Sequence, residues 1–130
     1  MIFGIQNLMG NALLFEKAIP VFVDVDPVTG NIDAKQVAEV AADLNRGGET
    51  ARRWLPRKGA ENAGELKSIL AVDVFGQPAD YDSLSPIVDR YGLTLIEDSC
   101  EALGAEYKGR RAGLFGDYGV FAFYPNKQIT

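Results

Sequence analysis

Short apolar runs alternate along this chain with segments in which apolar residues recur at helical spacing. The run from Pro20 to Asp26 is rich in β-branched and aromatic residues, which predicts a strand, and a turn ending at Gly30 follows. Asp33 can then cap a helix whose buried face is formed by Val37, Val40, Ala41 and Leu44. The stretch from Asn45 to Lys67 is polar and glycine-rich, so it predicts a long loop.

The second half of the chain repeats this alternation. Three further strands are predicted, at Ser68–Phe75, Thr94–Asp98 and Gly119–Tyr124. A helix is expected between the first two of them, with an apolar face at Leu84, Ile87, Val88 and Tyr91. Gly92 suits its C-terminal end, and Pro86 fits it only within the first turn, where a missing N–H costs nothing.

Strands this apolar, separated by helices, predict a parallel sheet with helices on both faces. The fold class is therefore α/β, and 130 residues suffice for a real core. A formal net charge of −5, from 13 basic and 18 acidic residues, argues against a nucleic-acid surface. No apolar run is long enough to cross a bilayer, and a single cysteine cannot form an intrachain disulfide. Both observations favour the cytoplasm.

Ligands of open parallel sheets bind at the carboxyl ends of the strands, and two predicted strands end there in charged residues. Glu97 and Asp98 close one of them, and Lys127 follows the last. The two-residue period of a strand turns Glu97 away from Asp98, which favours a structural role for Glu97. On spacing alone, Asp98 could instead cap a turn and Lys127 could be a surface lysine. With no histidine and one cysteine, no metal-site spacing exists.

The segment from Ile96 to Thr130 reads IEDSCEALGAEYKGRRAGLFGDYGVFAFYPNKQIT. It resembles the central signature of the DegT/DnrJ/EryC1/StrS family, aminotransferases that use pyridoxal 5'-phosphate (PLP) and act mostly on nucleotide-linked keto-sugars. Two upstream segments, IPVFVDVDPVTGNID and ILAVDVFGQPADYDSL, are similar to the preceding elements of that family, in the same order. The resemblance implies that residues 1–130 are part of a PLP-binding large domain of the aspartate-aminotransferase-like type (fold type I). Its N-terminal part and the C-terminal domain would be missing.

The same resemblance assigns roles at four positions. Lys127 would form an imine with the cofactor aldehyde and then carry the proton between substrate and cofactor. Asp98 would pair with the protonated pyridine nitrogen, which keeps the ring an electron sink. Cys100 would pack on the ring face. Glu101 stands where relatives commonly have Gln or His near the phenolic oxygen, and a carboxylate would repel a phenolate there unless one of them is protonated.

Some residues depart from the family pattern. Ala122 stands where relatives often have a serine that helps to hold the cofactor phosphate. Residues 1–10 are atypical, and Gln6 replaces an aromatic residue that usually stacks on the ring.

Full-length relatives build each active site from the two subunits of a homodimer.

The implied activity is transfer of an amino group from an amino acid, with glutamate expected as the donor, to a keto-sugar nucleotide. Sugar-dehydrating relatives replace the imine lysine by histidine, so Lys127 favours transamination. Alternatively, the chain is a truncated remnant that is inactive on its own. An unrelated nucleotide-binding module has no support, because neither GxGxxG nor GxxxxGK[ST] occurs.

Overall fold

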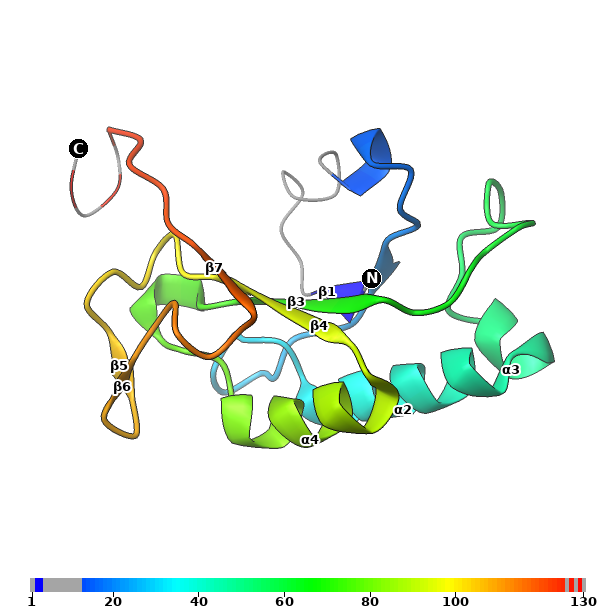
Figure 1. Cartoon of the computed structure of the whole chain (residues 1–130), viewed down its shortest axis with the longest axis horizontal. Helices are drawn as coiled ribbons and strands as arrows, with labels where there is room; N and C mark the ends of the chain where they lie inside the picture. Colours follow the sequence, from blue (N-terminus) through cyan, green and yellow to red (C-terminus); the bar gives the residue numbers. More distant parts are fainter. Residues whose placement is uncertain (1, 4–12, 126, 128, 130) are drawn as a thin grey trace.

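The computed structural model describes residues 2–3, 13–125, 127 and 129 (Figure 1). Gln6 and most of the atypical N-terminal region lie outside the described residues. Within them, the main sheet has five parallel strands in the order β2-β1-β3-β4-β7. Their bounds are β1 Ile2–Phe3, β2 Val21–Phe22, β3 Ser68–Val72, β4 Thr94–Asp98 and β7 Tyr118–Val120. The predicted α/β class with a parallel sheet is confirmed.

Two helices, α2 (Ala34–Arg46) and α4 (Tyr81–Tyr91), lie along the same face of this sheet (Figure 1). On the other face, the described part of the chain has no long helix. There, Leu70 and Val72 of β3 pack with Leu13, Val74 and Ile96. Among the described residues, the expectation of long helices on both faces is thus met on one face only.

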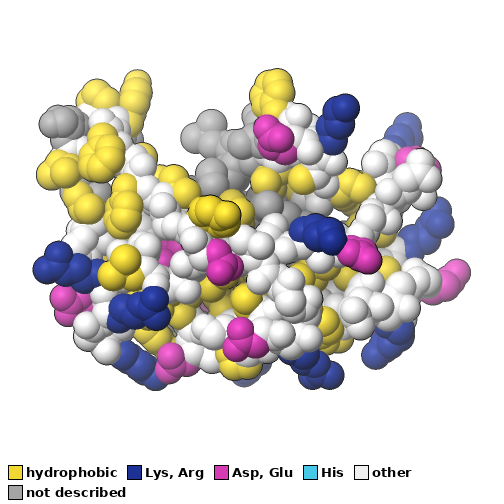
Figure 2. All heavy atoms as spheres, in the orientation of Figure 1, with side chains coloured by type: hydrophobic (Ala, Val, Ile, Leu, Met, Phe, Trp, Pro, Cys, Tyr) yellow, Lys and Arg dark blue, Asp and Glu magenta, His cyan; other side chains and the backbone are white. Residues whose placement is uncertain are grey.

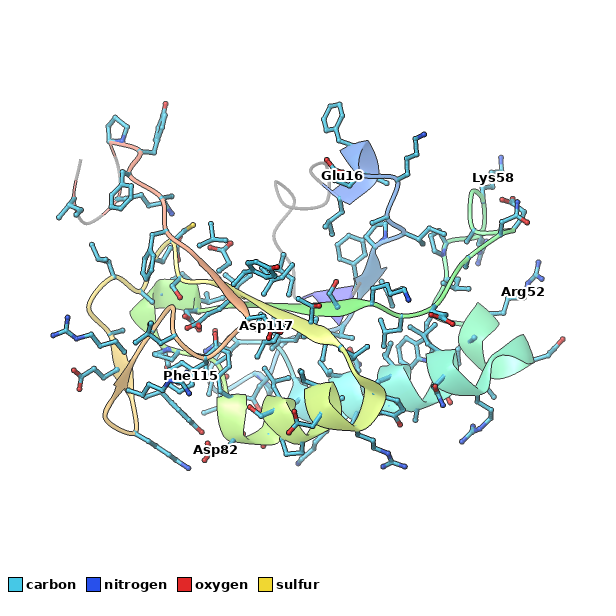
Figure 3. The ribbon with its side chains drawn as sticks, in the orientation of Figure 1. Glu16, Arg52, Lys58, Asp82, Phe115 and Asp117 are labelled. Carbon is cyan, nitrogen blue, oxygen red and sulfur yellow. The ribbon has the colours of Figure 1, made fainter. Side chains whose placement is uncertain are left out.

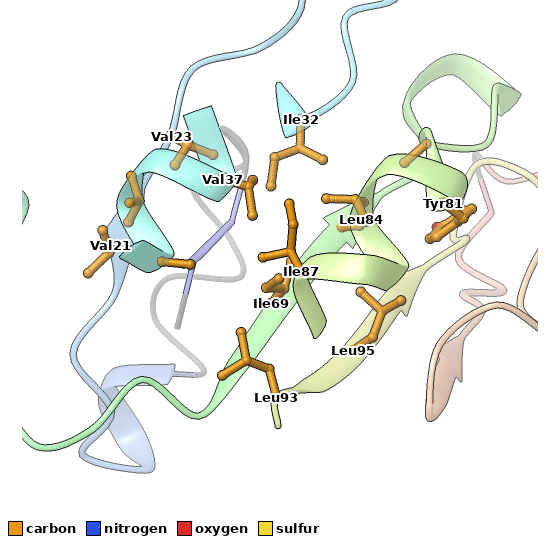
Figure 4. Packing of buried hydrophobic residues seen from close by; sticks show 14 residues of the cluster. Val21, Val23, Ile32, Val37, Ile69, Tyr81, Leu84, Ile87, Leu93 and Leu95 are labelled. Carbon is orange, nitrogen blue, oxygen red and sulfur yellow. The ribbon is translucent and has the colours of Figure 1, made fainter. Parts of the chain in front are cut away.

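Helix α2 forms as its sequence pattern predicts. The Asp33 carboxylate accepts hydrogen bonds from the backbone N–H groups of Lys35 (2.8 Å) and Gln36 (3.4 Å), and so caps the first turn. Val37 and Val40 are fully buried. The apolar face of α2 packs with that of α4 and with β3 and β4 to form the main core (Figure 4).

Helix α3 (Gly48–Arg52) lies within the stretch predicted as a loop, so that part of the prediction is wrong. Its surroundings are polar, which is why periodicity does not reveal it. The buried carboxylate of Asp43 in α2 accepts hydrogen bonds from Trp54 Nε1 (2.8 Å) and Arg53 Nε (3.0 Å) just beyond α3. These bonds hold the pKa of Asp43 below its usual value and tie α3 to α2.

Helix α4 begins at its Asp80 cap and ends at Gly92, which adopts the left-handed conformation (φ 59°). Pro86 lies in its second turn, not its first, so the condition set by the sequence is not met. The proline leaves the carbonyl of Asp82 without its usual helical donor. Asp82 is exposed, so water can satisfy that oxygen, and burial of Leu84 and Ile87 keeps the helix in place.

Strand ends differ from the predictions at three places. β2 is shorter than predicted; β3 stops at Val72 and is followed by the 3₁₀ turn η1 (Val74–Gly76); and β7 ends at Val120, before the predicted Tyr124. An unpredicted antiparallel hairpin, β5 (Glu106–Tyr107) and β6 (Arg110–Arg111), precedes β7. None of the described helices is long and apolar enough to cross a membrane.

Candidate cofactor site

The alternation along β4 places its last two residues in different surroundings. Glu97 is fully buried on the side of the helices. Its Oε2 accepts hydrogen bonds from the backbone N–H groups of Phe115 (2.8 Å) and Gly116 (3.2 Å), and its Oε1 accepts another from Gly113. The carboxylate therefore fixes the glycine-rich loop before β7 beneath the sheet, in the region where Figure 3 labels Phe115 and Asp117. The predicted structural role of Glu97 is confirmed.

A second buried carboxylate, which the sequence did not single out, joins this network. Asp73 follows β3 and is fully buried. It accepts hydrogen bonds from Ala79 N–H (2.9 Å), the Tyr81 hydroxyl (2.7 Å) and the Ser99 hydroxyl (2.7 Å). Burial raises the pKa of Asp73, and the neighbouring Glu97 acts in the same direction, whereas the hydrogen bonds from Tyr81 and Ser99 oppose the rise.

Asp98, one residue beyond Glu97, opens the candidate site at the carboxyl end of the sheet. It is 4% exposed, and its Oδ1 accepts a hydrogen bond of 3.1 Å from the backbone N–H of Cys100. The Cys100 thiol lies 3.7 Å from the carbonyl oxygen of Val120 at the end of β7. Burial raises the pKa of this thiol to about 12; Asp98 adds to the rise and the Lys127 charge opposes it. Both charges thus act on the same thiol.

Lys127 and Glu101 form an ion pair at this edge, with 3.4 Å between Lys127 Nζ and Glu101 Oε1. The other carboxylate oxygen of Glu101 accepts a hydrogen bond of 3.2 Å from the backbone N–H of Phe75. All four predicted site residues therefore gather at the carboxyl ends of β4 and β7. Phe75 is an additional neighbour, which the sequence did not indicate because it was expected within a strand.

The segment that carries Lys127 is rich in exposed apolar side chains. Phe123, Tyr124 and Ile129 are 59%, 71% and 55% exposed. Figure 2 shows apolar side chains gathered over this end of the molecule. The lysine amine therefore lies between a charged strand edge and an apolar surface.

The residues present suit the ring of PLP, whereas position 122 offers no side-chain donor to its phosphate. An amine and a nearby carboxylate are the groups that an aldehyde and a pyridine nitrogen require. Ala122 lies between β7 and Lys127, and its side chain has no donor for a phosphate, as the sequence predicts. The set fits the reactive ring of the cofactor.

A separate groove of about 640 Å³ lies at the N-terminal ends of α2 and α4. None of the four predicted site residues lines it. Three of its four acidic lining residues already have local roles: Asp33 and Asp80 cap the helices, and Asp26 accepts hydrogen bonds from Val28 and Thr29 in the turn after β2; the fourth is Glu106 of β5. The described residues contain no cluster of His, Cys, Asp and Glu that could hold a metal ion.

Known proteins resemble this chain in both sequence and fold. The profile of the DegT/DnrJ/EryC1/StrS aminotransferase family matches residues 9–130. A putative pyridoxal phosphate-dependent aminotransferase, EpsN of Bacillus subtilis, is 38% identical over 120 residues, which are 92% of this chain and 27% of the relative. GDP-perosamine synthase of Caulobacter vibrioides is 34% identical over 120 residues, again 92% of this chain and 27% of the relative.

A solved structure from Brucella abortus, a DegT DnrJ EryC1 StrS aminotransferase, superposes with a TM-score of 0.78 at 32% identity. The match covers 97% of this chain and 31% of that one. The chain therefore spans about a quarter to a third of the length of these relatives. Over that span, sequence and fold agree, and the chain belongs to the DegT/DnrJ/EryC1/StrS aminotransferase family.

Proposed function

We propose that this chain is the central part of a PLP-dependent aminotransferase that transfers an amino group from an amino acid to a nucleotide-linked keto-sugar. The observation that carries the proposal is the placement of Lys127 and Asp98 at the same end of a parallel sheet, in a chain of this family. The similarity to a GDP-perosamine synthase supports a sugar nucleotide as the acceptor. Glutamate as the donor and a homodimer of the whole protein belong to the same proposal.

When bound, PLP supplies an electron sink that stabilises negative charge on the substrate carbon. Lys127 would hold the cofactor covalently through Nζ, and its amine would carry the proton to and from the substrate carbon. Either task requires an amine that can lose its proton. Partial burial, with the side chain 20% exposed, keeps Nζ within reach of a ligand while excluding much of the water.

Asp98 and Cys100 orient the ring in this proposal. The Asp98 carboxylate, with Oδ1 held by the Cys100 N–H, would accept a hydrogen bond from the pyridinium nitrogen. The thiol would pack against the ring as a small apolar group, which agrees with its raised pKa, because a neutral thiol brings no charge to the ring face. Ala122 contributes no phosphate ligand, so the phosphate is held elsewhere in the whole protein.

Borohydride reduction in the presence of PLP tests this proposal. The purified chain is mixed with PLP, its visible absorbance is recorded, and the reduced product is mapped by peptide mass spectrometry. We expect a pyridoxyl label on Lys127 that is absent in Lys127→Ala and unchanged in Lys67→Ala, a control at a lysine whose side chain is 76% exposed. Labels scattered over exposed lysines would contradict a cofactor site at Lys127.

Turnover is tested separately, with glutamate and a keto-sugar nucleotide. Specific labelling of Lys127 without amino transfer would support the alternative, a chain that holds the cofactor but is inactive on its own.

A further inference from the structure

We propose that Glu101 is a positioning residue that holds the Lys127 amine in an ion pair at the carboxyl end of the sheet until a ligand displaces it. The inference deepens the proposed function of Lys127 and rests on it. It concerns the chain's own residues, so it can be tested without the cofactor.

The two oxygens of the Glu101 carboxylate bind groups from two different segments. Oε1 lies 3.4 Å from Lys127 Nζ, beyond β7, and Oε2 accepts a hydrogen bond of 3.2 Å from the N–H of Phe75, beyond β3. Glu101 itself follows β4. One side chain thus joins the ends of three parallel strands, and it does so at the edge where sheets of this kind bind ligands.

The corner of the chain formed by Phe75 and Gly76 in η1 holds Glu101 in place independently of Lys127. Phe75 adopts a left-handed backbone conformation with φ 56°, which is uncommon for a residue with a side chain and directs its N–H towards Glu101. At Gly76, which follows, an added Cβ would lie 3.3 Å from the Glu101 carbonyl oxygen. Both the backbone and the side chain of Glu101 are therefore packed against this corner, and Lys127 comes to a carboxylate that is already placed.

The charges around Lys127 decide what the pair does. Glu101 contacts the amine, and Asp98 and Lys127 both act on the intervening Cys100 thiol. The thiol is neutral at physiological pH, because its pKa is raised to about 12. The Glu101 carboxylate is thus paired directly with Lys127 Nζ, and the thiol beside them brings no charge. An ammonium ion has no lone pair with which to attack a carbonyl.

A ligand that reacts with Lys127 must therefore break this pair. The Glu101 carboxylate stays bonded to the Phe75 N–H when the amine leaves, so it remains at the site edge as an acceptor. Glutamine at position 101 would keep an oxygen for the Phe75 N–H and remove the charge. Glu101→Gln therefore separates the electrostatic effect on Lys127 from the packing at the corner.

The test measures the reactivity of Lys127 with trace acetic anhydride between pH 6 and 11, without PLP. Peptide mass spectrometry reports each lysine separately. We expect Lys127 to be acetylated about threefold faster at pH 7 in Glu101→Gln, because the amine is then released from its ion pair, a modest effect since the pair is partly exposed. The matched control is Glu65→Gln, which removes an exposed pair with Lys67 (2.6 Å) and should leave Lys127 unchanged.

A second measurement needs no variant. Raising the salt concentration from about 0.05 M to 1 M screens the pair, and should accelerate acetylation of Lys127 in the unaltered chain at pH 7. Equal Lys127 profiles in Glu101→Gln and the unaltered chain, or no response to salt, would overturn the proposal. Because neither readout involves PLP, failure of cofactor labelling at Lys127 would refute the proposed function and leave this result interpretable.

Discussion

Glu97 and Asp98 are neighbours in strand β4, yet they belong to different regions. Glu97 is part of a buried network on the helix side of the sheet, and Asp98 lies at the open edge of the sheet. On the helix side, Glu97 and Asp73 are fully buried, and between them they accept hydrogen bonds from four backbone N–H groups and the hydroxyls of Tyr81 and Ser99. At the open edge, Asp98 accepts a hydrogen bond from the Cys100 N–H and Glu101 accepts one from the Phe75 N–H, and Glu101 also pairs with an amine that a ligand can reach.

The difference lies in what the polar groups are bonded to. A buried carboxylate surrounded by backbone donors fixes the path of the chain, since its loss leaves those donors unpaired. A carboxylate beside a partly exposed amine leaves a reactive group that can exchange partners. The helix-side network thus supports the loop before β7, and the strand edge above it carries the proposed cofactor site. The predictions below separate these two roles.

The largest effect is expected for Glu97→Ala. It removes the acceptor of the Phe115 and Gly116 N–H groups in a buried place, which should lower the free energy of unfolding by about 3–5 kcal/mol. Urea denaturation measures this loss. The control Glu106→Ala, at an exposed position of β5, should change stability by less than about 0.5 kcal/mol. A loss below 1 kcal/mol for Glu97→Ala would mean that the loop does not depend on this carboxylate.

Asp98→Asn, in contrast to Glu97→Ala, should weaken PLP binding with little change in stability. It keeps the shape of the side chain and an oxygen for the Cys100 N–H, so we expect stability to change by less than about 1 kcal/mol. PLP affinity, measured by absorbance titration, should fall at least about tenfold, because an amide cannot balance a pyridinium charge. Unchanged PLP affinity, or a stability loss like that of Glu97→Ala, would erase the distinction between the two regions.

The sequence predicted the elements whose evidence is local. Asp33 with the spacing of α2, and Gly92 at the end of α4, are signals within one segment, and both are confirmed. β4 was predicted with its observed bounds, because both of its ends are marked in the sequence. The family resemblance located Lys127 and Asp98, which spacing alone left open.

What the sequence could not predict depends on contacts between distant segments. Helix α3 depends on Asp43 bonding to residues ten and eleven positions away, and no periodicity reports such polar contacts. In the sequence, Asp73 falls within a predicted apolar strand, and its hydrogen-bond partner Ser99 lies 26 residues further along the chain. Phe75 was assigned to a strand, because a left-handed residue after β3 has no sequence signal when it is not glycine.

A moderate effect of pH is expected from Asp73. Folding raises the pKa of this carboxyl, so the folded chain binds the proton more tightly than the unfolded chain does. The free energy of unfolding therefore falls as pH rises from about 4 through the folded pKa, by up to about 1.4 kcal/mol per pH unit.

Asp73→Asn removes this titration. Ser99 can then accept a hydrogen bond from the new amide and donate to Glu97, which lies 3.2 Å away. The stability of Asp73→Asn relative to the unaltered chain should rise with pH when urea curves at pH 4.5, 6 and 7.5 are compared. A constant difference would show that Asp73 does not titrate differently in the folded chain.

The smallest effect concerns the Cys100 thiol, where opposite variants should act in opposite directions. Burial is the main cause of its raised pKa, Asp98 adds to it, and Lys127 reduces it. Asp98→Asn should therefore speed alkylation by iodoacetamide at pH 8, and Lys127→Ala should slow it, each by about threefold, because only the thiolate reacts. Mass spectrometry of the single cysteine gives the rates, and Glu106→Gln serves as a control on the exposed hairpin. Acceleration in both variants would indicate that loosened packing, not charge, controls the thiol, and the case for Asp98 and Lys127 facing one site would lose its electrostatic support.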